Sequence, residues 1–212
     1  MLFELNRDTP VMVQGITGRM GQKHAALMQR YGTRIVGGTG RVRPGEPQAF
    51  PVYADCAQAV RATGALASIA LVPPQSTLQA VSEAVEAGLK LIVTVAEGVP
   101  VHDALRIRTL TRAAGVTWVG ASTPGLCIPG QAKLGFLPDV SLAPGAIGVM
   151  SKSGTLSYEV GRRMVARGLG QSAWIGVGGD PVKGVRFADL APGFARHDAT
   201  RAVLLIGEIG GD

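Results

Sequence analysis

The segment Pro10-Val-Met-Val-Gln-Gly-Ile-Thr-Gly-Arg-Met-Gly21 decides the fold of the first half of the chain. Its apolar start, Pro10 to Gln14, predicts a short buried strand, and the glycine-rich turn that follows opens a helix. Apolar residues then recur at helical spacing from Met20 to Tyr31, and Arg34–Gly38 predicts the next strand. A glycine turn between a strand and a helix is the context in which backbone N–H groups bind the phosphates of a nucleotide.

Basic residues follow the second strand, where a dinucleotide site usually has an acid. An NAD site uses an Asp or Glu about 20 residues beyond the glycine turn to bind ribose hydroxyls. Here the sequence has Arg41 and Arg43. We therefore expect a ligand with an additional phosphate, such as NADP or coenzyme A (CoA), in preference to NAD. The alternative is that both arginines are solvated loop charges.

Strands and helices keep alternating up to residue 120. Apolar runs at 66–72, 91–95 and 117–120 are separated by helical spacing at 76–87 and 103–114. With the first two strands they predict a doubly wound parallel sheet, an α/β fold of the Rossmann type, whose ligands bind at the carboxyl ends of the strands. The unusual turns all follow strands: the glycine turn, the arginine loop, Pro73-Pro74, Glu97-Gly98 and residues 121–125.

A second series of strands and helices begins at Ala146. Residues 126–145, rich in Pro and Gly, predict a linker after a first domain of residues 1–125. Strands are expected at 146–150, 173–177 and 201–206, and helices at 156–167 and about 185–196, the second interrupted by Pro192. Three strands and two helices are barely enough to form an independent core. Residues 146–212 therefore predict an incomplete α/β domain that a partner or further chain completes.

The turn Met150-Ser-Lys-Ser-Gly-Thr-Leu-Ser-Tyr-Glu159 lies between the first strand and the first helix of this series. Gly154 can take a positive φ, and Ser151, Ser153 and Thr155 are suited to capping a helix or contacting an anion. The first turn of a helix carries free N–H groups and the positive end of the helix dipole. We therefore expect this turn to hold a phosphoryl or carboxylate group; an ordinary N-cap that binds nothing is the alternative.

Composition argues against several classes of function. The 212 residues are 46% hydrophobic and 17% charged and include 30 glycines, which is typical of an α/β protein with a buried sheet. Aromatic residues make up 5%, too few for a surface that stacks nucleic-acid bases. The net charge of +6 comes from scattered Lys and Arg, which favours anionic small molecules or an acidic partner over nucleic acid.

The cysteines and the N-terminus predict a cytoplasmic protein. Cys56 and Cys127 have no metal-ligand spacing, so we expect free thiols in a reducing compartment and no metal site. The first residues lack the basic and apolar regions of a signal peptide. No apolar run approaches the roughly 20 residues that span a bilayer, so no membrane contact is expected.

Seven motifs, in order, resemble the α subunit of succinyl-CoA synthetase, the ADP- or GDP-forming succinate–CoA ligase, over essentially all 212 residues. The motifs are Gly15–Gly21, Val36–Gly38, Val72–Pro74, Ala96–Gly98, Ser151–Glu159, Gly176–Pro181 and Gly207–Gly211. The resemblance implies a CoA-binding Rossmann-like domain followed by a flavodoxin-like ligase domain, here incomplete. It also implies an enzyme that joins succinate or a similar dicarboxylic acid to CoA at the expense of a nucleoside triphosphate, through acyl phosphate and phosphohistidine intermediates.

The resemblance assigns roles to individual residues. The residues implied to bind CoA are Thr17, Gly18, Arg19, Met20, Arg43, Pro73, Ala96, Glu97, Gly98 and Ser122. Ser153, Gly154 and Thr155 are implied to hold the phosphoryl group. Tyr158 is implied to contact the acid, and Glu208 to orient the phosphorylated histidine. Magnesium and the nucleoside triphosphate are expected on the implied partner, a β subunit of the ATP-grasp type.

The chain departs from the family pattern at several points. A Gly-Pro-Asn turn of the family reads Gly120-Ala-Ser122 here, Arg43 replaces a lysine, and Ser-Arg-Ser-Gly reads Ser151-Lys-Ser-Gly154, which loses bidentate geometry. The family's phosphorylated histidine lies in a Gly-His-Ala-Gly motif beyond Gly211, and the 212 residues stop before it. The three histidines present cannot replace it, because they are expected to be structural or solvated: His24, His102 and His197.

We therefore expect a chain that binds CoA and is inactive alone in the phosphohistidine relay. Two other functions stay open. A non-catalytic CoA-binding module is consistent with the missing histidine and the altered Asn turn. An NADP-dependent oxidoreductase is consistent with the arginine loop, although no Tyr-x-x-x-Lys pattern accompanies it.

Overall fold

The structure, a computed structural model, describes residues 1–43 and 45–209. The first half of the chain forms a six-stranded sheet in the order β3-β2-β1-β4-β5-β6, and every neighbouring pair of strands is parallel. The strands are β1 (Val11–Gln14), β2 (Ile35–Thr39), β3 (Val52–Tyr53), β4 (Ala67–Ala70), β5 (Leu91–Thr94) and β6 (Thr117–Gly120). The strand order reverses beside β1, and this switch point is where doubly wound sheets bind their ligands. The expected α/β fold with a Rossmann-like sheet is confirmed.

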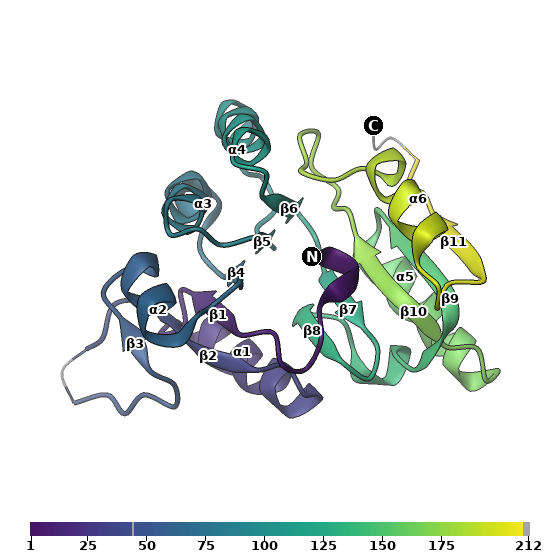
Figure 1. Ribbon diagram of the computed structural model, residues 1–212, viewed down its shortest axis with the longest axis horizontal. Coiled ribbons are helices and arrows are strands. Elements are labelled where there is room, and N and C mark those ends of the chain that lie inside the picture. The colour runs from purple at the N-terminus through teal and green to yellow at the C-terminus, as the bar shows by residue number, and fades with distance from the viewer. Residues whose placement is uncertain (44, 210–212) are drawn as a thin grey trace.

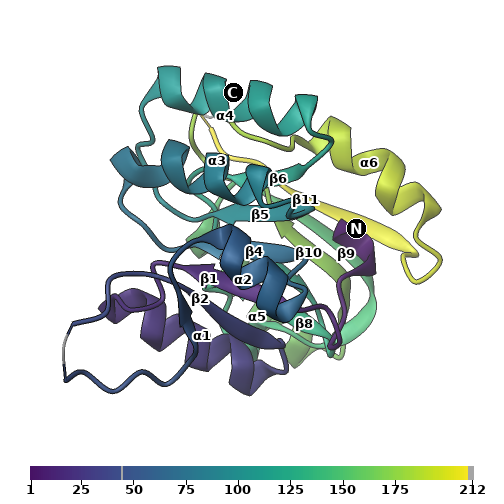
Figure 2. The same cartoon turned by 60° about the vertical axis from the view of Figure 1, so that its left-hand side comes forward.

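Helices cover both faces of this sheet. They are α1 (Arg19–Tyr31), α2 (Cys56–Thr63), α3 (Thr77–Glu86) and α4 (Val101–Ala113). Three of them, α2, α3 and α4, lie side by side on the outer face (Figures 1 and 2), where a core containing Met12, Ile107 and Trp118 forms beneath them. The sequence analysis missed α2, whose eight residues show little more than two helical turns, and β3, because a two-residue strand is too short to show alternation.

A second, five-stranded sheet has the order β11-β9-β10-β7-β8. Its strands are β7 (Gly125–Ile128), β8 (Ala132–Gly135), β9 (Pro144–Ser151), β10 (Gln171–Gly176) and β11 (Ala202–Ile206). Strand β9 is parallel to β10 and β11, whereas β7 is antiparallel to both β10 and β8. The helices α5 (Gly154–Ala166) and α6 (Phe187–Arg196) pack against this sheet (Figure 1). Short 3-10 helices lie at Leu2–Glu4, Pro74–Ser76 and Asp139–Ser141.

Residues 126–145 are not a linker, in contrast to the prediction. They contain a hairpin of β7 and β8, in which Leu126 pairs with Leu134 and both side chains are fully buried. Gly125 and Gly135 face each other at the open end of the hairpin with positive φ values of 103° and 137°. Each strand is four residues long and carries a glycine at one end, so the apolar pattern is too short to be recognised.

Helix α6 is not interrupted at Pro192 either. It continues to Arg196 because Leu190 and Phe194, one on each side of the proline, are both buried and hold it against the sheet. The two halves of the molecule share one core, in which Val13 and Met28 from the first half join Leu134 and Ile175 from the second. The two sheets therefore form a continuous packed body.

Candidate functional site

Two cavities lie at the carboxyl ends of the parallel strands. The first, which we call the α5 cavity, has a volume of about 500 Å³ and adjoins the N-terminus of α5. It is lined by Val95, Glu97, Ser122, Thr123, Pro124, Phe136, Lys152, Ser153, Gly154, Thr155, Tyr158, Gly179, Asp180, Pro181, Glu208 and Ile209. The second, the arginine cavity, has a volume of about 1190 Å³ and lies at the start of α1.

The α5 cavity brings together residues from both sequence halves that the resemblance assigns to one reaction. They are Glu97, Ser122, Ser153, Gly154, Thr155, Tyr158 and Glu208. These residues follow different strands, β5, β6, β9 and β11, or belong to the first helical turns of α5. Within each sheet the carboxyl ends of the parallel strands lie at one edge, and the packing of the two sheets on a shared core brings the two edges together.

The N-terminus of α5 borders the α5 cavity and has the features that favour an anion. Ser153 is the N-cap, and its Oγ accepts a hydrogen bond from the Leu156 N–H at 3.4 Å. The hydroxyl of buried Ser151 donates to the Ser153 carbonyl at 2.7 Å, which fixes the turn before the helix. The first turn contains no acidic residue, so the positive end of the helix dipole faces the cavity without a competing carboxylate of its own.

Tyr158, one turn along the same helix, faces this cavity with its hydroxyl protonated. Burial raises the pKa of the Tyr158 phenol above its ordinary value, so the group acts as a neutral hydrogen-bond donor at neutral pH. A Cβ placed on Gly154 would lie 3.9 Å from the Tyr158 hydroxyl oxygen, which shows how near the hydroxyl is to the start of the helix. The arrangement offers a hydroxyl donor beside a set of free backbone N–H groups.

The loop after β6 is held between the two sheets. Ser122 has a positive φ of 56°, which is uncommon for a residue other than glycine. Its N–H donates to the Ala96 carbonyl at 2.8 Å, and its own carbonyl accepts from the Gly179 N–H at 3.2 Å. The Thr123 hydroxyl donates to the Gly176 carbonyl at 2.6 Å. Strained backbone held by surrounding contacts in this way is typical of functional sites.

The arginine cavity is strongly basic. Its lining residues are Thr17, Gly18, Arg19, Gln22, Lys23, Arg41, Val42, Arg43, Glu46 and Pro47. Arg19 begins α1, and Arg41 and Arg43 follow β2. Arg43 is 3.5 Å from the Glu46 carboxylate, an exposed pair that a phosphate could displace at little cost. Cationic side chains around a helix N-terminus suit the phosphates of an extended anionic ligand.

Some of the sequence-predicted residues lie elsewhere, and some of the lining residues were missed. Met20, Pro73, Ala96 and Gly98 are not among the described residues that line either cavity. Gln22 and Lys23 were not predicted, although they lie three and four residues after Arg19 on α1, a spacing that places them on the same helix face. Phe136 and Asp180 were missed because they reach the α5 cavity through long-range packing. Gly210 and Gly211, part of a predicted motif, lie outside the described residues.

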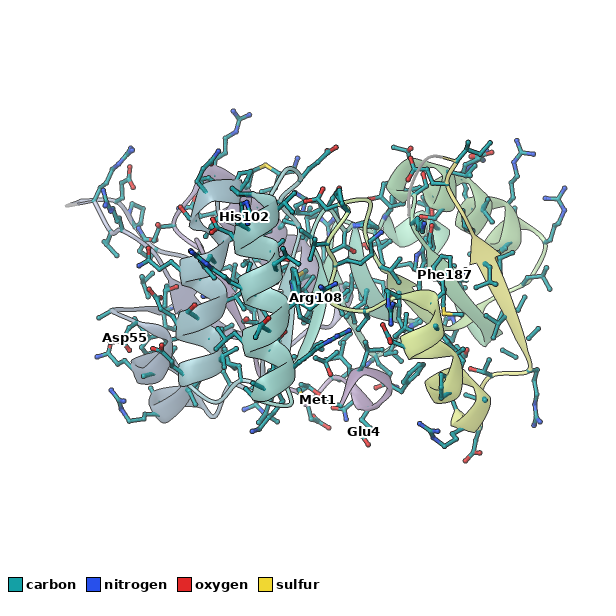
Figure 3. All side chains as sticks on the ribbon, turned by 90° about the horizontal axis from the view of Figure 1, so that it is seen from above. Met1, Glu4, Asp55, His102, Arg108 and Phe187 are labelled. Atoms are coloured by element: carbon teal, nitrogen blue, oxygen red, sulfur yellow. The ribbon has the colours of Figure 1, made fainter. Side chains whose placement is uncertain are left out.

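None of the three histidines is among the described residues that line the α5 cavity, although His24 packs behind one of them. His24 packs on Phe136 with ring centroids 4.2 Å apart, and burial is the main cause that lowers its pKa. His197 shares a hydrogen bond of 2.8 Å with the Thr200 hydroxyl, and His102 is exposed near the start of α4 (Figure 3). Within residues 1–43 and 45–209, no group of three or more His, Cys, Asp and Glu side chains could hold a metal ion. In the same part of the chain, no helix is both long and apolar enough to cross a lipid bilayer.

Comparison with known proteins places this chain in a family. Residues 6–98 match the family profile described as "CoA binding domain". The chain is 43% identical over 211 residues to succinate–CoA ligase [ADP-forming] subunit alpha 1 of Archaeoglobus fulgidus, covering 98% of this chain and 72% of the relative. The chain belongs to the acid–CoA ligase α-subunit family. A second member of this family, the malate–CoA ligase subunit alpha of Methylorubrum extorquens, is 40% identical, with 100% of this chain and 73% of that protein covered.

The family fold also extends to a larger enzyme. The structure of ATP citrate lyase from Methanothrix soehngenii, in complex with citrate and coenzyme A, superimposes with a TM-score of 0.83 at 20% sequence identity. The superposition covers 98% of this chain and 37% of that one. At this identity the likeness concerns the fold, and the superimposed part includes both sheets.

Proposed function

We propose that this chain binds CoA and receives a phosphoryl group as the α subunit of an acid–CoA ligase. One observation carries the proposal: the N-terminus of α5, Glu97, Ser122, Tyr158 and Glu208 line one cavity of about 500 Å³. Relatives of this chain are named as subunits of ligases for succinate, malate and sulfoacetate, and the first two of these acids are dicarboxylic. A dicarboxylic acid is therefore the proposed substrate class.

The chemistry requires such a cavity. A carboxylate oxygen is a poor leaving group, so the acid first takes a phosphoryl group and becomes an acyl phosphate. The CoA sulfur then attacks the acyl carbon, the carbon–oxygen bond to phosphate breaks, and inorganic phosphate leaves. Backbone N–H groups at the start of α5, capped by Ser153, stabilise the charge on the phosphoryl oxygens in both steps. The Tyr158 hydroxyl, which lines the same cavity, is the proposed donor to a carboxylate of the acid.

CoA is proposed to span the two cavities. Its nucleotide phosphates suit the arginine cavity, where Arg19, Arg41 and Arg43 supply positive charge, and its thiol end must reach the α5 cavity. In the sheet order, β4 and β5 lie between β1, which leads into the arginine cavity, and β6, which leads into Ser122. The turns after β4 and β5 are therefore the proposed path of the pantetheine arm.

A β subunit of the ATP-grasp type is the proposed partner. In this scheme it supplies the nucleoside triphosphate and magnesium, and the phosphoryl group reaches the α5 cavity on a histidine that Glu208 orients. Glu208 is exposed directly after β11 and lines the α5 cavity, so it faces both the surface and the site. The cysteines are unpaired thiols, which supports a reducing compartment such as the cytoplasm.

Calorimetric titration with CoA tests the proposal. We expect the Arg19→Gln variant to bind CoA about 10- to 150-fold more weakly than the wild type, because one charge-assisted hydrogen bond to phosphate is worth about 1.5–3 kcal/mol. The matched control is Arg30→Gln, an exposed arginine in the last turn of the same helix, which should bind as the wild type does. Raising the salt concentration should weaken binding by the wild type.

Two results would overturn this proposal. The first is no heat of binding at millimolar CoA. The second is equal affinity in the Arg19→Gln variant and the wild type, which would place the phosphates outside the arginine cavity. Phosphate release that depends on acid, CoA and nucleotide, after co-expression with a β-type subunit, distinguishes the ligase from a non-catalytic CoA-binding module.

A further inference from the structure

A buried carboxylate from the second sheet holds a turn of the first. Asp180 lies in the loop after β10 and is 8% exposed. Its Oδ1 accepts a hydrogen bond from the Gly98 N–H at 3.3 Å, and its Oδ2 accepts from the Val99 N–H at 3.2 Å. Gly98 and Val99 follow β5, more than 80 residues earlier in the chain, at separations of 82 and 81.

The two hydrogen bonds explain how the Asp180 carboxylate can be buried. A buried carboxylate is costly unless its oxygens are satisfied by donors, and here each oxygen has one backbone N–H. The carboxylate therefore acts on the turn of residues 96–99 as a bidentate clamp. Gly98 has a φ of 74°, a left-handed conformation, and Glu97 immediately before it lines the α5 cavity.

Other contacts hold the loops at the junction of the two sheets. The Ser122 N–H donates to the Ala96 carbonyl at 2.8 Å, and the Gly179 N–H donates to the Ser122 carbonyl at 3.2 Å. A Cβ on Gly178 would lie 1.9 Å from the Ala121 carbonyl oxygen, so this loop approaches the other backbone closely. Three loops, residues 96–99, 120–123 and 176–180, thus interlock at the junction of the two sheets.

We propose that Asp180 is a positioning residue that fixes the turn 96–99 against which the thiol end of CoA is aligned. This inference rests on the proposed function, because it assumes that the ligand passes the carboxyl end of β5 on its way to the α5 cavity. The reacting sulfur must come within about 3–3.5 Å of the acyl carbon, and a misplacement of about 1 Å costs about 100-fold in rate. Because Asp180 and α5 both belong to the second half of the chain, a turn held by Asp180 fixes the position of the thiol relative to the N-terminus of α5.

The test compares two ligands that differ in the part the turn would contact. CoA carries the pantetheine arm and thiol, whereas adenosine 3′,5′-bisphosphate represents its nucleotide end alone. Calorimetry on the full chain measures both with Asp180→Asn, whose amide NH₂ would face one of the two N–H groups. We expect CoA to bind about 10-fold more weakly and the bisphosphate to bind as tightly as to the wild type.

The matched control is Asp55→Asn. Asp55 caps α2 by accepting from the Gln58 N–H at 2.6 Å, and asparagine caps a helix equally well. Figure 3 shows Asp55 at the outer end of the first half, on the far side from Phe187 of α6. This variant should bind both ligands as the wild type does.

Each result has one reading. A selective loss of CoA affinity in Asp180→Asn supports the positioning role. An equal loss for both ligands, or unchanged CoA affinity, overturns it while the proposed function stands. A wild-type chain that does not bind CoA removes the proposed function and this inference together. If Asp180→Asn does not fold, Asp180→Glu keeps the charge but displaces the carboxylate by one methylene, and the same selective loss is expected.

Discussion

Replacing Gly21 by alanine tests whether α1 must approach the glycine turn as closely as the structure shows. A Cβ at this position would lie 2.0 Å from the Gly15 carbonyl oxygen and 2.8 Å from the Ile16 Cα. Both neighbours are backbone atoms of the turn, so they cannot move aside as the end of a flexible side chain could. The matched control is Gly18→Ala, where the new Cβ would lie 3.4 Å from the same oxygen.

The two substitutions should differ clearly in stability. Overpacking costs about 1–3 kcal/mol, and contacts with backbone place Gly21→Ala at the upper end. Alanine gains about 1 kcal/mol over glycine inside a helix, so we expect a net loss of about 2 kcal/mol. For a chain of this size that lowers the melting temperature by about 4–8 °C. At Gly18 the φ of −71° suits alanine, and a weaker N-cap costs less than about 1 kcal/mol.

Thermal unfolding followed by circular dichroism measures both variants under identical conditions, and calorimetry then measures CoA binding below the transition. Gly21→Ala should also bind CoA more weakly, because the turn that would receive the phosphates is displaced with α1. Equal melting temperatures for Gly21→Ala and Gly18→Ala would show that the close approach of helix and turn is not needed for stability, and the reasoning would fail.

Two further predictions concern titratable groups. Burial is the main cause that raises the pKa of Cys56 and of Cys127 to about 12, so neither thiol should react with Ellman's reagent at pH 8 until the protein is unfolded, when two thiols appear; rapid labelling of the native chain would contradict this. Hydrogen bonds from Arg162 and Arg163 hold the pKa of Glu159 at about 2. Because that pKa is lowered from 4.5, the stabilisation is present at neutral pH and is lost as the pH falls toward 2. The difference in melting temperature between the wild type and Glu159→Gln should shrink over that range, and a constant difference would refute the assignment.

Local patterns predicted most of the elements because each is long enough to repeat its period. The runs that became β4, β5 and β9 are apolar and bounded by glycine, proline or polar turns, and helix α1 shows a clear 3.6-residue period. The elements that were missed are short. The hairpin of β7 and β8 and the two-residue strand β3 are stabilised by pairing with strands elsewhere, and such long-range pairing leaves little local signal.

The same difference between local patterns and long-range contacts separates the site residues that were predicted from those that were missed. Residues in contiguous motifs, such as Ser153 to Thr155 at the start of α5, were recognised because one helix terminus supplies both the geometry and the charge. The separation of the predicted CoA-binding residues into two cavities was not predictable, since it depends on the strand order. Asp180 belongs to a recognised motif, but its contact with Gly98 spans 82 residues and appears only in the folded chain.

The missed hairpin also explains how the two cavities keep a defined separation. Helix α1 borders the arginine cavity at its first turn and ends at Tyr31, beside the hairpin. There the Thr33 hydroxyl donates to the Lys133 carbonyl at 2.8 Å and accepts from the Lys133 N–H at 2.9 Å, both within the core. The buried Lys133 ammonium pairs with Asp139 and lies 4.8 Å from the centre of the Tyr31 ring.

The hairpin continues from Lys133 directly to Phe136, which lines the α5 cavity. A ligand bound at the start of α1 is thus connected to the wall of the α5 cavity through a helix, an ion pair between buried Lys133 and exposed Asp139, and a four-residue strand. The Lys133 ammonium is buried, and a buried charge is costly without partners, so its contacts with the Leu137 carbonyl and Asp139 fix the position of this strand. The span from the arginine cavity to the N-terminus of α5 is therefore set by the packed core, and a ligand that spans both cavities, as proposed for CoA, must match it.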